Sequence, residues 1–135
     1  MTKQYMLDTN VISSLMSEPN GRVAAKIEKV GEGCICCSII VAGELRYGAE
    51  KKGSEKLSRY IEAVLAAIPV LTLNTPVDKT YGTIRHTLTS AGTLIGPNDL
   101  WIAAHAITES LILVTDNEKE FQRIPSLSVE NWVRE

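Results

Sequence analysis

Short apolar runs alternate along this chain with longer segments of helical periodicity, and this alternation restricts the possible folds most strongly. Runs apolar enough to form buried strands lie at residues 5–9, 34–38, 69–73, 111–115 and 127–130. Helical segments lie between them, at residues 10–17, 21–30, 39–52, 54–68, 76–91 and 96–110. Apolar strands that alternate with helices predict a mostly parallel sheet with helices on both faces. We therefore expect an α/β fold, a three-layer α/β/α sandwich.

The length and patterning are those of one globular domain. The chain has 135 residues, and no linker, repeat or charge block divides it, so residues 1–135 are expected to form a single domain. No apolar stretch approaches the ~20 residues of a membrane-spanning helix, and the first residues lack the pattern of a secretion signal. We expect a cytoplasmic protein with no membrane partner.

Three cysteines are crowded into the second apolar run, as Cys34, Cys36 and Cys37. An odd number at this spacing suits neither a set of disulfides nor a zinc site. Cysteine is commonly buried as a small apolar residue. We expect all three side chains to lie in the core.

The charge of the chain excludes one class of function and leaves another open. A formal net charge of −2 argues against a protein that coats nucleic acid without discrimination. Residues 46–59, however, carry five basic and two acidic side chains. A solvated helix surface is the simpler interpretation of this stretch, but Arg46, Lys51 and Lys52 are candidates for contacts to an RNA backbone.

Four acidic side chains are placed so that they meet at one edge of the predicted sheet. Asp8 ends the first strand and Asp116 directly follows the fourth, so parallel strands bring both to the same edge. Asp99 lies in the first turn of the helix at 96–110, and Glu44 lies about two turns into the helix that follows the second strand. Each acid alone has an ordinary explanation as a cap, a turn former or a solvated residue. Because ligands bind beyond the carboxyl ends of parallel strands, the four together predict one site.

Such a cluster of carboxylates needs a compensating charge. Two carboxylates ~4 Å apart repel by ~4 kcal/mol at an effective dielectric constant of 20, so either some are protonated or a divalent cation neutralises them. Oxygen ligands without cysteine or paired histidine favour Mg²⁺ or Mn²⁺ over Zn²⁺. An acidic site with such an ion fits the cleavage of phosphodiesters, because the metal activates water and offsets charge on phosphate oxygens.

Several polar residues beside these acids are expected to orient them by hydrogen bonds. For two of them, the threonine after the first strand and the serine after the second, capping of a helix is an equally good explanation. The supporting residues are Thr9, Asn10, Ser38, Thr115 and Asn117.

The two histidines do not suggest a metal-free mechanism. His86 and His105 lie in different predicted helices, and neither has an acid beside it in the order that acid–base catalysis needs. We expect them to be surface or packing residues.

Four segments of the chain resemble the successive motifs of PIN-domain ribonucleases, and specifically of the VapC toxins of bacterial toxin–antitoxin pairs. The segments are "MLDTNVIS", "SIIVAGELRYGA", "GTLIGPNDLWIAAHA" and "LILVTDNEKEFQRIPSLSVENW". They extend from Tyr5 to Trp132, nearly the whole chain. The resemblance implies a PIN-like fold and a Mg²⁺- or Mn²⁺-dependent endoribonuclease that a VapB-type antitoxin neutralises.

The resemblance also implies roles for individual residues. Asp8 and Asp99 would be the principal metal ligands, Glu44 would complete the pocket or position the attacking water, and Asp116 would be the fourth acid. The third and fourth segments are most similar to the subgroup that cuts initiator tRNA in its anticodon region, and a homodimer is typical of the family. In that subgroup asparagine is common at the position of Asp116.

Two other functions remain as alternatives at this point. A catalytically silent PIN domain would bind RNA or a protein partner only, although a scaffold gains nothing from four repelling acids. A haloacid-dehalogenase-like phosphatase also places an aspartate after its first strand, but it has an acid two residues later, where this chain has Asn10.

Overall fold

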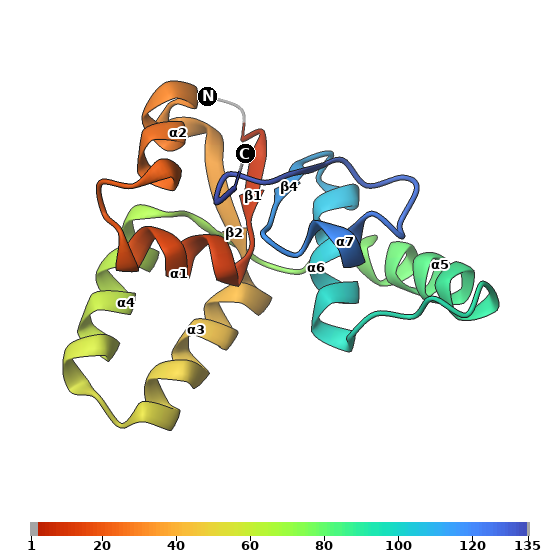
Figure 1. The fold of residues 1–135 in the computed structure, drawn as a ribbon. Coiled ribbons are helices and arrows are strands. Elements are labelled where there is room, and N and C mark those ends of the chain that lie inside the picture. The colour runs from red at the N-terminus through yellow and green to blue at the C-terminus, as the bar shows by residue number, and fades with distance from the viewer. Residues whose placement is uncertain (1–2, 135) are drawn as a thin grey trace.

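The computed structural model describes residues 3–134, and they form a five-stranded parallel sheet with helices on both sides (Figure 1). The strands are β1 (Tyr5–Leu7), β2 (Ile35–Ser38), β3 (Val70–Leu71), β4 (Ile112–Val114) and β5 (Val129–Glu130). Their order across the sheet is β3-β2-β1-β4-β5, so the first strand lies at the centre. This confirms the predicted three-layer α/β/α fold.

All the helices except the last lie in the segments where helical periodicity was found. They are α1 (Thr9–Ser17), α2 (Arg22–Val30), α3 (Ile39–Lys52), α4 (Glu55–Ala67), α5 (Val77–Ser90), α6 (Pro97–Thr108) and α7 (Glu118–Phe121). Figure 1 shows α1, α2 and α4 on one side of the sheet and α5 and α6 on the other. The sequence pattern missed α7, which has a single turn, and the 3₁₀ turn Glu32–Cys34, because neither is long enough to show a helical period.

The core lies on both faces of the central strands. Met6, Leu7 and Leu113 are fully buried, and so are Cys36 and Cys37 of β2. Burial raises the pKa of the Cys36 thiol to about 11 and that of Cys37 to about 12. These cysteines are therefore neutral packing residues, as the sequence predicted.

Two helices that start at the carboxyl edge of the sheet have a side-chain cap from the strand end before them. The Asp8 carboxylate accepts a hydrogen bond from the Thr9 amide at the start of α1, at 2.8 Å. The Ser38 hydroxyl accepts one from the Ile40 amide at the start of α3, at 3.2 Å. α6 starts instead with Pro97, whose fixed φ suits the first turn of a helix. Three helix starts are thus gathered at one edge.

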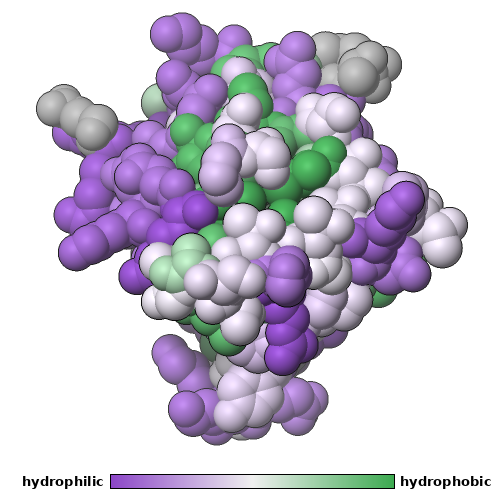
Figure 2. Space-filling model, turned by 90° about the vertical axis from the view of Figure 1, so that its right-hand side faces the viewer, coloured by the Kyte–Doolittle hydropathy of each residue, from purple (hydrophilic) through white to green (hydrophobic). Residues whose placement is uncertain are grey.

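The surface on the side of α5 is largely polar, with an apolar area left between the polar groups (Figure 2). Among the described residues, the exposed large apolar side chains are Ile39, Tyr47, Tyr60 and Leu94. Apolar surface of this kind is a common feature of interaction sites. No helix within residues 3–134 has the length and apolar character that crossing a membrane requires.

Candidate active site

Asp8 lies at the centre of the carboxyl edge and is held by two donors. One carboxylate oxygen accepts the amide of Thr9, and the other accepts the hydroxyl of Thr115 at 2.8 Å. The side chain is only 5% exposed. Burial raises the pKa of Asp8 and nearby Glu44 adds to the effect, while the bonds from Thr115 and Thr9 oppose it. The carboxylate is thus fixed in place but lacks full charge compensation.

Glu44 reaches the same edge from α3. Its side chain accepts a hydrogen bond from the Thr9 hydroxyl at 2.5 Å and a longer one from the Asn98 amide at 3.4 Å. Thr9 thereby contacts Glu44 rather than Asp8 through its side chain, and Asn98 joins the site from the first turn of α6. The sequence did not single out Asn98, although it directly precedes Asp99 in the same helical turn.

Asp99 is affected both by burial and by neighbouring acids. Burial raises the pKa of Asp99 to about 6, and the charges of Asp8, Glu120 and Glu44 contribute to the increase in that order. Acids from β1, α3, α6 and α7 are therefore near enough to repel one another. We call Asp8, Glu44, Asp99 and Glu120 the acid cluster.

The carboxylate of Asp116 contacts residues outside the acid cluster. It accepts hydrogen bonds from the Asn131 amide at 3.0 Å and from the Arg134 guanidinium at 2.8 Å, and these partners lower its pKa. None of the charges that raise the pKa of Asp8 or Asp99 belongs to Asp116. The fourth acid of the cluster is Glu120, whose charge acts on Asp99.

Glu120 was passed over because it lies beyond the end of the fourth strand, in a helical turn that the pattern did not reveal. The buried Phe121 anchors that turn. The side-chain amide of Asn117 donates to Glu120 and fixes its orientation. The signal available in the sequence was the spacing, because Glu120 lies four residues after Asp116 and so one helical turn further on.

The other predicted supporting residues form a network behind the cluster. The Thr115 hydroxyl accepts the backbone amide of Asn117 at 3.0 Å, and the side-chain amide of Asn10 lies 3.4 Å from the same oxygen. The Asn10 carbonyl oxygen accepts the backbone amide of Asp116 at 3.0 Å. Ser38 caps α3 and bonds to His105 at 2.8 Å. The bonds of Asn10 and Thr115 link the ends of β1 and β4, and the bond of Ser38 joins the end of β2 to α6.

The predicted RNA-contact residues lie further along α3. The Arg46 guanidinium makes two 2.8 Å hydrogen bonds to the exposed carboxylate of Glu62. Lys51 and Lys52 occupy the last turn of α3 and are exposed. Lys52 lines a groove of about 420 Å³ whose lining also includes Thr9 and Glu44. One basic side chain therefore shares a groove with Glu44, one member of the acid cluster.

The donors of the acid cluster suit a hard divalent cation. All of them are carboxylate oxygens, which Mg²⁺ and Mn²⁺ prefer, and within residues 3–134 none of the four acids forms an ion pair. In the arrangement described, no three His, Cys, Asp or Glu side chains of this part of the chain are already close enough to hold a metal. Because the acids must come closer together to hold a metal, and Glu44 now contacts Thr9 and Asn98, we expect its side chain to turn on ligation.

Known proteins similar to this chain share one family. The family model of the PIN domain matches residues 5–127. Ribonuclease VapC2 of Haemophilus influenzae is 38% identical over 131 residues, which cover 96% of this chain and 98% of that protein. The tRNA(fMet)-specific endonuclease VapC of Salmonella typhimurium is 34% identical over 130 residues, with coverage of 96% and 98%. The crystal structure of VapBC2 from Rickettsia felis bound to a promoter DNA fragment gives a TM-score of 0.89 at 36% identity, covering 98% of this chain and 99% of that chain.

Proposed function

This chain belongs to the PIN-domain family and, within it, to the VapC ribonucleases, and from that premise we propose that it is a divalent-metal-dependent endoribonuclease. It acts in the cytoplasm as the toxin of a type II toxin–antitoxin pair, and residues 1–135 are one nuclease domain. The observation that carries the proposal is the acid cluster, in which Asp99 has a pKa of about 6 through burial and through Asp8, Glu120 and Glu44. Uncompensated acids at the carboxyl edge of a parallel sheet fit a cation-binding catalytic site.

Asp8, Asp99 and Glu44 are the residues that we propose to hold Mg²⁺ or Mn²⁺. When bound, such an ion supplies an activated water at neutral pH and offsets charge on phosphate oxygens. Asp8 is fixed by Thr115 and the Thr9 amide, so it provides the rigid ligand of the set. Glu44 is only half-buried and is the side chain best placed to orient the attacking water.

The identity of the fourth acid is the main difference between the metal ligands predicted from the sequence and those that we propose. We assign it to Glu120, because this charge acts on Asp99 and Asn117 holds its carboxylate. Asp116 is proposed to have a structural role, since Asn131 and Arg134 occupy its carboxylate.

The proposed substrate is tRNA, and within that class the anticodon region of initiator tRNA. Relatives that are 34% and 35% identical to this chain carry the name tRNA(fMet)-specific endonuclease. The groove that leads from Glu44 to Lys52 has an acidic end for a cation and a basic end for a phosphate. Lys51 and Arg46 lie outside it on the same helix, where they would add weaker contacts to the RNA backbone.

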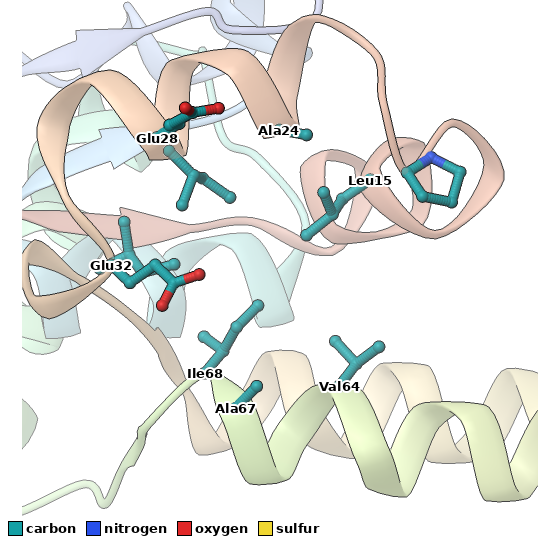
Figure 3. Close-up of a pocket in the computed structure, with 10 residues that line it drawn as sticks. Leu15, Ala24, Glu28, Glu32, Val64, Ala67 and Ile68 are labelled. Carbon is teal, nitrogen blue, oxygen red and sulfur yellow. The ribbon is translucent and has the colours of Figure 1, made fainter.

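The proposed protein partner is a VapB-type antitoxin. Similar chains were crystallised in VapBC complexes from Rickettsia felis, Salmonella typhimurium and Haemophilus influenzae. A second groove, of about 540 Å³, lies between α1, α2 and α4, and Figure 3 shows Leu15 and Val64 pointing into it from opposite sides. Its lining is mainly apolar and includes Glu28 and Glu32, which suits an apolar peptide with a basic residue. A homodimer is proposed from the family.

Two alternatives make different predictions. A silent PIN domain would bind RNA without cutting it. A dehalogenase-like phosphatase would hydrolyse p-nitrophenyl phosphate, but the side chain of Asn10 is engaged with Thr115 and the amide of Asp116.

Cleavage of RNA by the purified chain tests the proposal. Freed from any antitoxin, the protein is expected to cut initiator tRNA with Mg²⁺ or Mn²⁺ and to stop on addition of EDTA. Asp8→Asn should abolish cleavage, whereas Asp78→Asn, an exposed acid in the first turn of α5, should leave it intact. Cleavage that survives Asp8→Asn or EDTA would contradict the mechanism, and RNA binding without cleavage would favour the silent domain.

A further inference from the structure

We propose that His105 is a positioning residue: its neutral ring, protonated on Nε2, accepts the hydroxyl of Ser38 and so fixes Glu44 relative to Asp99. The hydrogen-bonding part of the proposal stands on the geometry and on the burial of the ring. The consequence for Glu44 and Asp99 rests on the proposed function, because it concerns their ability to hold a cation.

His105 occupies a fully buried position between three elements. Its exposed fraction is zero, as is that of Ser38 at the end of β2. Nδ1 of the ring lies 2.8 Å from the Ser38 oxygen. Burial lowers the pKa of the ring, and the charge of Glu109 and the backbone of Thr72, just after β3, oppose this effect. His105 therefore joins α6 to the ends of two adjacent strands.

The hydrogen bonds around Ser38 favour one of the two neutral tautomers of the ring. The Ser38 oxygen already accepts the amide of Ile40 at the start of α3, at 3.2 Å. Its hydroxyl hydrogen is free to point at Nδ1, which then acts as the acceptor. Burial lowers the pKa of His105 and favours the neutral ring. With Nδ1 as the acceptor, the single proton of that neutral ring is on Nε2.

The protonated nitrogen, Nε2, lacks a good hydrogen-bond acceptor among the described residues. Nε2 has no hydrogen-bond partner of good geometry within residues 3–134. The backbone of Thr72 favours a protonated ring. A backbone carbonyl oxygen has this effect and an amide N–H does not, so the Thr72 carbonyl is the natural acceptor for Nε2–H. A buried polar group with such a poor partner costs stability. Packing alone would be served better by an apolar ring.

The bond between His105 and Ser38 links the two helices that carry half of the acid cluster. Asp99 lies six residues before His105 on α6, and Glu44 lies six residues after Ser38, on α3. Six residues of helix span about 9 Å, a length over which a helix is stiff. Loss of this bond is therefore expected to shift Glu44 relative to Asp99.

Two substitutions of His105 separate the roles of the two nitrogens. In His105→Asn the side-chain oxygen occupies the place of Nδ1 and can still accept the Ser38 hydroxyl. In His105→Gln the polar atoms lie near the place of Nε2, and Ser38 loses its acceptor. Ser38→Ala removes the hydroxyl and keeps the ring, so it tests the same bond if a His105 variant does not fold.

The first measurement is the ¹⁵N NMR spectrum of the histidine side chains in the full chain at pH 7. We expect one buried ring with a protonated Nε2 and an unprotonated Nδ1, and a change at Nδ1 in Ser38→Ala. A ring protonated on Nδ1, or on both nitrogens, would overturn the proposal.

The second measurement is the affinity for Mn²⁺ by calorimetric titration, read beside the melting temperature. His105→Gln and Ser38→Ala are expected to weaken Mn²⁺ binding about tenfold, and His105→Asn to retain most of the affinity. Leu88→Ala in α5 is the control: it removes a buried side chain and should lower the melting temperature without changing Mn²⁺ affinity. Equal affinities of wild type, His105→Gln and Ser38→Ala would refute the positioning role.

A wild-type chain that binds no Mn²⁺ would contradict the proposed function. The His105 proposal is still decided in that case by the ring spectrum and by amide hydrogen exchange in the first turn of α3. Faster exchange of Ile40 and Val41 in His105→Gln than in His105→Asn supports it, and equal exchange refutes it.

Discussion

Replacement of Asp99 by asparagine should make the protein more stable at neutral pH while it destroys the site. The carboxyl of Asp99 has a pKa of about 6 because of burial and the charges of Asp8, Glu120 and Glu44. Its ordinary pKa is 3.8. A group whose pKa is raised by folding stabilises the native state below its unfolded pKa, and this contribution disappears as the pH rises through the native pKa. Asparagine is neutral at every pH and avoids the loss.

The size of the effect follows from the two pKa values. A rise from 3.8 to about 6 corresponds to roughly 3 kcal/mol against the charged form. Asp99 is partly exposed, and water that reaches it screens part of the repulsion. We therefore expect Asp99→Asn to be more stable than wild type by about 1–2 kcal/mol at pH 8, with the difference vanishing near pH 4.

Urea unfolding of both proteins at pH 4, 6 and 8, without divalent metal, measures this difference. Asp78→Asn is the matched control, because Asp78 also lies in the first turn of a helix but is exposed. It loses a favourable interaction with the helix dipole and should not gain stability. Saturating Mn²⁺ should stabilise wild type and leave Asp99→Asn unchanged. An Asp99→Asn protein that is less stable than wild type at pH 8 would refute the electrostatic account of the cluster.

Three further changes test other parts of the structure. Thr115→Val leaves a buried oxygen of Asp8 without its 2.8 Å donor and should cost about 1–3 kcal/mol in urea unfolding; a neutral effect would show that the bond contributes nothing. Glu120→Gln should weaken Mn²⁺ binding in calorimetry whereas Asp116→Asn should not, and the reverse order would restore Asp116 as the fourth ligand. Gly53→Ala places a side chain at a φ of 65° at the end of α3 and should lower the unfolding free energy by about 1 kcal/mol; unchanged stability would argue against strain there.

Much of the fold was accessible from the sequence because its strongest signals are local. The buried strand before Asp8 and the fully apolar run before Thr115 predicted the centre of a parallel sheet. Capping by Ser38 correctly marked the start of α3. Strand ends were less well defined, since residues such as Thr9 have strand propensity but belong to a helix in the structure.

The details of the site depended on contacts that no local pattern encodes. The position of Asp116 directly after the fourth strand predicted a metal ligand. Its side chain instead contacts Asn131 and Arg134, which follow it by 15 and 18 residues. Glu120 reaches the cluster through a helical turn too short to show periodicity. His105 was expected to be a surface or packing residue, and only tertiary structure reveals its bond to Ser38.

The most direct test of the central claim is the anomalous X-ray scattering of Mn²⁺ in crystals of the full chain soaked with that ion. The account predicts a peak within about 2.5 Å of carboxylate oxygens from Asp8 and Asp99, with Glu44 turned away from Thr9 and toward the ion. Strong anomalous peaks only elsewhere on the surface, with the four acids arranged as they are without metal, would contradict it.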